Sequence, residues 1–220
     1  MKAAPYGSWK SPITADKAAA MSVRFLEVDI QGNQIFWLER HPSEGGRVVL
    51  MSWKAAEGVK EVLPKEYSVR TRANEYGGGA LLLAGDRIYF INDKDQQLYC
   101  FEGGKVRQVT HEKNARFADG CIDPKDGSLY YVREVHGDKV VNTIVKIEPK
   151  SGEIKTVAAG HDFYSNPRIS PDGRQLAYVR WDQPNMSWDG SELYLLDLKT
   201  VKERLIAGGK TESIADPQWG

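Results

Sequence analysis

The chain has 220 residues, of which 41% are hydrophobic and 27% are charged, and its 30 basic side chains balance its 30 acidic ones. This composition is typical of a folded domain with a sizeable core, and the balanced charge argues against nucleic acid or an acidic membrane surface as the main partner. The longest apolar runs, such as residues 80–84, are too short to cross a bilayer.

The first 20 residues form an arm that contains proline and glycine and has no continuous apolar stretch, so it is unlike a secretory signal. Only Ala15 to Met21 could form a helical turn or two. We expect Tyr6 and Trp9 to pack the arm against a neighbouring domain.

The two cysteines, Cys100 and Cys121, both lie in apolar surroundings. Two cysteines do not make a disulfide framework in a chain of this length. We therefore expect two buried free thiols in a reducing compartment, and a cytoplasmic location.

Beyond the arm, apolar and polar residues alternate in short runs bounded by turn residues, which is typical of β-strands. One hairpin pattern occurs four times, at residues 30–38, 83–91, 123–132 and 170–179. Its turns carry Gly-Asn, Gly-Asp or Asp-Gly pairs, which supply the positive φ that a tight hairpin needs. The four hairpins align at Ile35, Ile88, Leu129 and Leu176, and these residues are 53, 41 and 47 positions apart.

A second hairpin follows each first one. Its leading strands are expected at 48–53, 97–101, 143–147 and 192–197, and its trailing strands at 59–63, 106–109, 153–157 and 201–206. Two hairpins in each repeat make a four-stranded antiparallel sheet, the blade of a β-propeller. The sequence therefore predicts an all-β propeller; a tandem sandwich is the alternative, but a sandwich has no reason to repeat its strand order at this interval.

The predicted domains are the arm (1–20) and a partial β-propeller (21–220). Four complete blades are expected at about 21–64, 65–110, 111–158 and 159–210. Residues 215–220 match residues 165–170, which open the fourth blade, so 211–220 are expected to begin a fifth. On this reading the chain is a fragment of a longer polypeptide.

Two segments carry a family resemblance. Residues 4–14 (Ala-Pro-Tyr-Gly-Ser-Trp-Lys-Ser-Pro-Ile-Thr) and 72–80 (Arg-Ala-Asn-Glu-Tyr-Gly-Gly-Gly-Ala) resemble the prolyl oligopeptidase family of serine peptidases, in its acylaminoacyl-peptidase and dipeptidyl-aminopeptidase-like members. The turn Ser170–Arg174 is also frequent there and is shared with TolB-like propellers. The resemblance covers essentially the whole chain.

The resemblance implies an N-terminal propeller, usually seven-bladed, joined to an α/β-hydrolase domain with a Ser-Asp-His triad. Such a propeller covers the active site and limits access to short peptides. Blades five to seven and the hydrolase domain are absent from these 220 residues.

The sequence contains no Gly-x-Ser-x-Gly nucleophile elbow. Gly208–Thr211 is not a phosphate loop, because Arg204 occupies the upstream glycine position. Asp93–Asp95 is not a calcium loop, because Gln97 and Leu98 replace an oxygen ligand and a glycine. We therefore expect no catalytic residue, no metal site and no cofactor.

The long connections join the second strand of a blade to the third, or one blade to the next, at residues 41–46, 64–79, 133–138 and 180–190. Because strands alternate in direction, these loops share one face of the propeller, here called the long-loop face, and the tight turns share the other. Binding residues concentrate on such loops, so we expect this face to be the interacting one.

Five candidate contact residues precede a run of three glycines: Arg70, Arg72, Asn74, Glu75 and Tyr76. They are expected to meet peptide termini or a hydrolase domain. The alternative is an ion pair that fixes the crossing between two blades. Trp181 and Trp188 are candidates for an apolar docking patch, with packing between blades as the alternative.

The predicted function is that of the N-terminal propeller part of a serine peptidase, which gates or docks short peptides for an α/β-hydrolase domain and is not catalytic by itself. The alternative is a stand-alone propeller that binds a protein partner. Such a module would close its ring by pairing residues 25–31 with the tail near 215–219. Self-association through open blade faces is a further expectation, because each blade buries its faces on the next.

Overall fold

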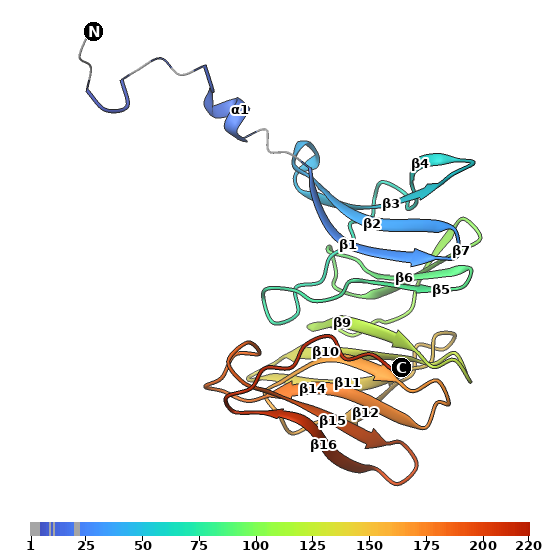
Figure 1. The fold of residues 1–220 in the computed structure, drawn as a ribbon. Coiled ribbons are helices and arrows are strands. Elements are labelled where there is room, and N and C mark those ends of the chain that lie inside the picture. Colours follow the sequence, from blue (N-terminus) through green and yellow to red (C-terminus); the bar gives the residue numbers. More distant parts are fainter. Residues whose placement is uncertain (1–4, 9, 11, 20–22) are drawn as a thin grey trace.

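The computed structural model describes residues 5–8, 10, 12–19 and 23–220. The arm contains one short helix, α1 (Ala15–Ala19), and extends away from the sheets (Figure 1). The expected helical turn thus begins at Ala15, while Met21 lies outside the described residues. Trp9 also lies outside them, and Tyr6 is fully exposed.

Sixteen strands form four antiparallel sheets in the described part of the chain, each in sequential strand order. Blade one contains β1 (Arg24–Gln31), β2 (Gln34–His41), β3 (Arg47–Lys54) and β4 (Gly58–Glu61), with a 3₁₀ turn at Pro42–Glu44. Blade two contains β5 (Leu81–Ala84), β6 (Arg87–Ile91), β7 (Leu98–Glu102) and β8 (Lys105–Gln108). Blade three contains β9 (Ala115–Ile122), β10 (Leu129–His136), β11 (Val140–Ile147) and β12 (Ile154–Ala158). Blade four contains β13 (Phe163–Ile169), β14 (Gln175–Trp181), β15 (Ser191–Asp197) and β16 (Lys202–Gly209).

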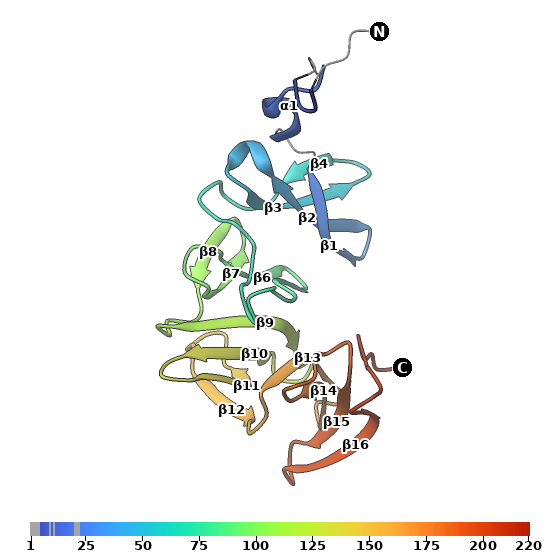
Figure 2. The ribbon, with the colours of Figure 1, turned by 90° about the vertical axis from the view of Figure 1, so that its left-hand side faces the viewer.

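The four sheets follow one another around an arc (Figure 2), with the first strand of each innermost. β1 contacts β5, β5 contacts β9, and β9 contacts β13, so these first strands line the axis side by side. This arrangement is a β-propeller, and the predicted fold class with four complete four-stranded blades is confirmed.

The core lies between the blades. One apolar cluster joins blades one, two and three, and includes Leu50, Phe90 and Phe117. A second joins blades three and four, and includes Ile144 and Tyr178. Blades two and three are enclosed on both faces, whereas blade one and blade four each have one sheet face that no other described blade covers.

The tail after β16 lies beside β13. Trp219 donates its indole N–H to the carbonyl of Arg168 (2.9 Å), and Asn166 donates its amide to the carboxylate of Asp216 (3.2 Å). Residues 213–220 form no strand, and β1 pairs with β2 alone among the described strands. The pairing of residues 25–31 with 215–219, which would close the ring, is therefore not made in this structure.

Cys100 and Cys121 are free and buried, as the sequence predicts. Burial raises the pKa of the Cys121 thiol to about 11, so this thiol stays protonated at neutral pH. The described residues include no helix of the length and hydropathy needed to span a membrane.

Candidate functional site

Strand direction places the long connections at one end of the blades. β2 runs toward the loop at residues 42–46, β4 toward residues 62–80, and β14 toward residues 182–190. β1 also begins at this end (Figure 1). The long-loop face therefore combines the irregular loops with the start of the first strand.

Arg70 and Arg72 are held against blade two. The backbone N–H of Arg70 donates to the carbonyl of Ile91 (2.9 Å). The Arg72 guanidinium donates to the carboxylate of Asp93 through two nitrogens, each at 2.9 Å, and its backbone N–H donates to the side chain of Gln96 (2.6 Å). Arg72 is thus paired, whereas the Arg70 side chain has no such partner among the described residues.

Asn74 and Glu75 cross from blade two to blade three. Both have positive φ (53° and 63°), and the backbone N–H of Asn74 donates to the buried carboxylate of Glu134 on β10 (2.7 Å). Arg116 on β9 contacts Glu75 (2.6 Å) and Glu134 (3.3 Å). The hydrogen bond from Arg116 lowers the pKa of the Glu75 carboxyl. These contacts form an ion-pair network between two blades, which is the structural alternative for this segment.

Tyr76 is 60% exposed and lies at the rim of a cavity of about 370 Å³ between blades one and two. The glycines that follow it bring the backbone close to β9. A Cβ at Gly78 would lie 2.9 Å from a carboxylate oxygen of Asp119, and the N–H of Gly79 donates to the same carboxylate (2.6 Å). A side chain at Gly78 would therefore disrupt the contact between blades two and three.

Two half-buried carboxylates that the sequence analysis did not select lie near the axis. Glu27, at an irregularity in β1, accepts hydrogen bonds from the backbone N–H groups of Ala80 (2.8 Å) and Leu81 (3.3 Å). Asp119 accepts bonds from Gly79 and from Asn166 (3.2 Å). Each carboxylate thus fastens the first strand of one blade to the next blade. Burial raises the pKa of Glu27 to about 7 and also raises that of Asp119.

The axial contacts repeat along the chain. Asp119, Asn166 and Asp216 have similar positive φ values of 56°, 49° and 46°. With Glu27 they line an axial cavity of about 570 Å³. The repeated pairs Asn166-Pro167 and Asp216-Pro217 are the sequence signal that could have identified these positions, because Asn and Asp tolerate this backbone conformation better than most residues.

The two tryptophans lie in blade four, away from the 70–76 segment. Trp181 is 5% exposed, and its ring stacks on that of Phe163 with centroids 5.3 Å apart. The ring of Trp181 therefore packs against a strand of its own blade, whereas the alternative considered for it was packing between blades. Trp188 is 65% exposed and remains accessible to a partner.

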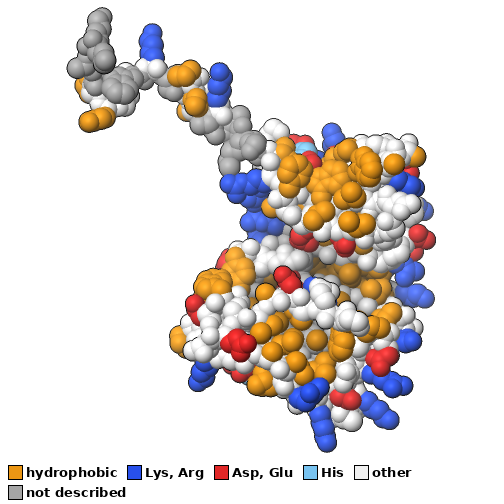
Figure 3. Space-filling model, viewed as in Figure 1, with side chains coloured by type: hydrophobic (Ala, Val, Ile, Leu, Met, Phe, Trp, Pro, Cys, Tyr) orange, Lys and Arg blue, Asp and Glu red, His pale blue; other side chains and the backbone are white. Residues whose placement is uncertain are grey.

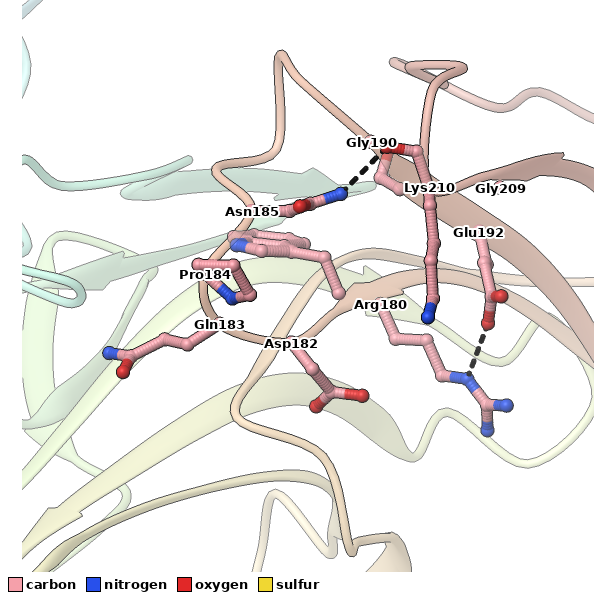
Figure 4. A pocket seen from close by; sticks show the side chains of 11 residues that line it. Arg180, Asp182, Gln183, Pro184, Asn185, Gly190, Glu192, Gly209 and Lys210 are labelled. Carbon is pink, nitrogen blue, oxygen red and sulfur yellow. Dashed lines mark hydrogen bonds and ion pairs between the residues drawn. The ribbon is translucent and has the colours of Figure 1, made fainter.

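The loop between β14 and β15 borders a pocket of about 460 Å³ (Figure 4). Asn185 donates its side-chain amide to the carbonyl of Lys210 (2.8 Å), and Arg180 donates to Glu192 (3.4 Å). The pocket shares no lining residue with the cavity beside Tyr76. The structure therefore brings Arg70 to Tyr76 together as one group and leaves Trp181 and Trp188 in another.

Three of the four histidines have carboxylate partners. His41 contacts Glu39 and Glu44, His136 contacts Glu134, and His161 contacts Asp182. Within the described residues no histidine forms a hydrogen bond to a serine, and these residues include no cluster of three or more side chains able to hold a metal ion.

The similarity of this chain to known proteins is found among solved structures. No family model matches the chain, and no curated protein matches it. Among solved structures, a puromycin-hydrolysing peptidase of Mycobacterium tuberculosis is 30% identical with a TM-score of 0.86, over 98% of this chain and 37% of that one. A puromycin hydrolase is 29% identical with a TM-score of 0.86, over 100% of this chain and 38% of that one.

A more distant structure, TolB from Acinetobacter baumannii, is 14% identical with a TM-score of 0.59 and shows the shared fold alone. The chain spans less than two-fifths of the length of the two puromycin-hydrolysing enzymes, yet nearly all of it aligns with them. Together with the motifs at residues 4–14 and 72–80, this shows that the chain belongs to the prolyl oligopeptidase family as its N-terminal propeller part.

Proposed function

We propose that this chain is part of a serine peptidase in which the propeller gates or docks short peptides for an α/β-hydrolase domain, and that it is not catalytic by itself. The observation that carries this proposal is the 30% identity to a puromycin-hydrolysing peptidase over 98% of this chain. The 37% coverage of that relative leaves ample length there for a further domain. We retain the division into an arm (1–20) and a partial propeller (21–220) as part of this proposal.

The long-loop face is the proposed working surface. It carries the exposed Tyr76 and also Arg70, whose side chain has no partner among the described residues. These two groups suit an aromatic or a charged part of a peptide. Arg72, Asn74 and Glu75 are engaged in contacts between segments, so we propose that they position the loop. Trp188, exposed in blade four, is the proposed apolar contact for a neighbouring domain.

Acyl-enzyme chemistry requires a serine nucleophile with a histidine base and an oxyanion hole. We place these groups in the hydrolase domain. The buried free thiols support the cytoplasmic location that the sequence predicts.

The test combines an immunoblot with active-site labelling. An antibody raised against the 220-residue chain is used on an extract of the source cells treated with a fluorophosphonate probe. We expect a polypeptide well over twice 24.7 kDa that carries the label, while the purified 220-residue chain shows neither labelling nor peptide hydrolysis.

An unlabelled band at 24.7 kDa alone would contradict the proposal. It would favour a stand-alone module that binds a protein partner. Stoichiometric labelling of the purified chain would contradict the statement that this part is not catalytic.

A further inference from the structure

Three arginines gather where the arm meets blade one. Arg24 begins β1, Arg40 is near the end of β2, and Arg70 comes from the loop between blades one and two. They line a pocket of about 310 Å³ on the long-loop face, together with Pro42, Gly45, Gly46 and Asp93. Basic side chains are visible at this junction in Figure 3.

None of the three guanidinium groups has a hydrogen-bond or ion-pair partner among the residues that the structure describes. The Nε of Arg40 is fully shielded from solvent and is also unpaired. The acid in the pocket wall, Asp93, already receives two nitrogens of Arg72. An unpaired, shielded guanidinium nitrogen is costly, because such a donor has lost water without gaining an acceptor.

The strand register makes this gathering more costly. Arg24 and Arg40 are directly opposite each other in the β1–β2 pairing, so their side chains project on the same face of the sheet. Like charges at directly opposite positions destabilise a sheet. Arg70 adds a third positive charge from a separate segment of the chain. A bound anion would offset the repulsion and supply the missing acceptor.

An adjoining cavity indicates what kind of anion fits. Arg40 and Arg70 also line the cavity of about 370 Å³ beside Tyr76. Its wall includes four apolar side chains: Leu26, Leu38, Val48 and Val69. A ligand held at the arginines can therefore place an apolar group in this cavity. The planar fork of arginine matches the two oxygens of a carboxylate.

We propose that Arg24, Arg40 and Arg70 bind the carboxylate of a small organic acid whose apolar part enters the adjoining cavity. Two sources supply such a group: a free acid, or the C-terminus of a short peptide. The second source would deepen the proposed function, while carboxylate binding itself does not depend on it and requires no hydrolase domain.

The test measures binding to the purified 220-residue chain by calorimetry at constant ionic strength. The probes are N-acetyl-leucine, N-acetyl-leucinamide, N-acetyl-Ala-Ala-Leu and inorganic phosphate. We expect the two carboxylates to bind. The amide should bind at least about tenfold more weakly, because it offers the arginines no charged acceptor. Phosphate should also bind at least about tenfold more weakly, because it has no apolar group to place in the adjoining cavity. A tripeptide that binds more tightly than N-acetyl-leucine identifies a peptide as the source, and equal binding identifies a free acid.

Variants connect the binding to these residues. Arg40→Gln and Arg70→Gln are each expected to weaken carboxylate binding about tenfold or more. The matched control is Arg107→Gln, on the exposed face of β8, which should bind as the unmodified chain does. Arg24→Gln, at an exposed position, serves if Arg40→Gln does not fold.

Melting in the absence of ligand gives a second readout. Because Arg40→Gln removes a like charge opposite Arg24, it should melt at or above the temperature of the unmodified chain.

Equal binding of the acid and its amide would overturn the proposal, as would absence of saturable binding, equal binding of phosphate, or unchanged binding by both Arg40→Gln and Arg70→Gln. Each of these results concerns binding alone and leaves the proposed peptidase role untouched.

Discussion

The environment of Glu27 differs from the one that its position in a solvent-exposed stretch of β1 suggests. Its side chain lies between blades one and two and accepts hydrogen bonds from the backbone N–H groups of Ala80 and Leu81. These hydrogen bonds favour the charged carboxylate, whereas burial disfavours it more strongly, so the pKa rises from 4.5 to about 7. The ionisation of Glu27 is therefore coupled to how tightly blades one and two pack.

The sign of the resulting pH dependence follows from linkage. Between pH 4.5 and 7 the folded protein retains a proton on Glu27 that the unfolded chain has released. The contribution of Glu27 to the free energy of unfolding therefore falls as pH rises through this window, by up to about 3 kcal/mol. The full cost of the ionised carboxylate is present above pH 7.

We predict that Glu27→Gln gains stability relative to the unmodified chain as pH rises from 5 to 8. The amide cannot ionise, so the cost of the buried charge disappears. Urea unfolding of both proteins at several pH values measures the difference. Asp86→Asn, in the exposed turn between β5 and β6, is the control. A difference between Glu27→Gln and the unmodified chain that does not change with pH would contradict the coupling.

The segment from Arg70 to Tyr76 acts as an element that links blades, although it contains no regular secondary structure. It is fixed to blade two through Asp93 and to blade three through Glu134. Arg116 contacts both Glu75, whose side chain is 78% exposed, and Glu134, whose side chain is 4% exposed. These two acids offer a matched comparison, because they share one cation and differ in burial.

We predict that Glu134→Ala lowers the free energy of unfolding by about 3 kcal/mol, because it leaves the backbone N–H of Asn74 without an acceptor and removes the buried one of the two carboxylates that Arg116 contacts. Glu75→Ala should lower it by no more than about 1 kcal/mol, because exposed ion pairs contribute little. Chemical denaturation of both variants measures the two changes. Similar losses for both would mean that the exposed ion pair, and not the buried carboxylate, fixes the loop.

The positions of the strands were predictable from the sequence, whereas the contacts that residues 70–76 make with blades two and three were not. Every expected strand of the second hairpins overlaps an observed strand, because alternation and turn residues are local signals. The partners of the 70–76 segment are at Asp93, Arg116 and Glu134, as far as 60 residues away in sequence. No local pattern indicates which of many charged side chains would meet it.

In the molecule as a whole, the first and last blades each present an apolar surface. Phe25, Val28 and Ile30 on β1 are exposed, as are Val201, Leu205 and Ile206 in or beside β16. Figure 3 shows hydrophobic side chains on blade one and on the sheet at the opposite end of the arc. Large exposed apolar patches are rare on monomeric proteins and mark surfaces that bind other surfaces.

We predict that the isolated 220-residue chain self-associates in a concentration-dependent manner through these faces, because each buries apolar area that a neighbouring blade would otherwise cover. The double variant Val28→Lys/Ile30→Lys should shift the population toward monomer. The control is Val140→Lys/Val141→Lys, at two exposed valines at the start of β11. Sedimentation velocity over a range of concentrations measures the association.

A chain that is monomeric at all concentrations would contradict the prediction. The same would hold if the control pair shifted the population as strongly as the β1 pair does. Either result would indicate that the open faces do not govern association.

The sequence alone determined the fold class, the number of complete blades and the family. These properties depend on signals that recur within a few residues, namely the two-residue period of the strands, the Gly-Asn and Asp-Gly turns and the two motifs at residues 4–14 and 72–80. It also selected residues 70–76 as a candidate contact site. The structure shows that this segment contacts two other segments of the chain, while its contact with a peptide or a hydrolase domain stays a prediction.

Only the tertiary structure decided which charged side chains are buried and which are left unpaired. Glu27 and Asp119 lie in strands whose local pattern does not distinguish them from surface acids, and their burial results from blades that come together from distant parts of the chain. Arg24, Arg40 and Arg70 converge for the same reason. The energy of a charge depends on its distance from other charges and from water, and those distances are set by the packing of the blades.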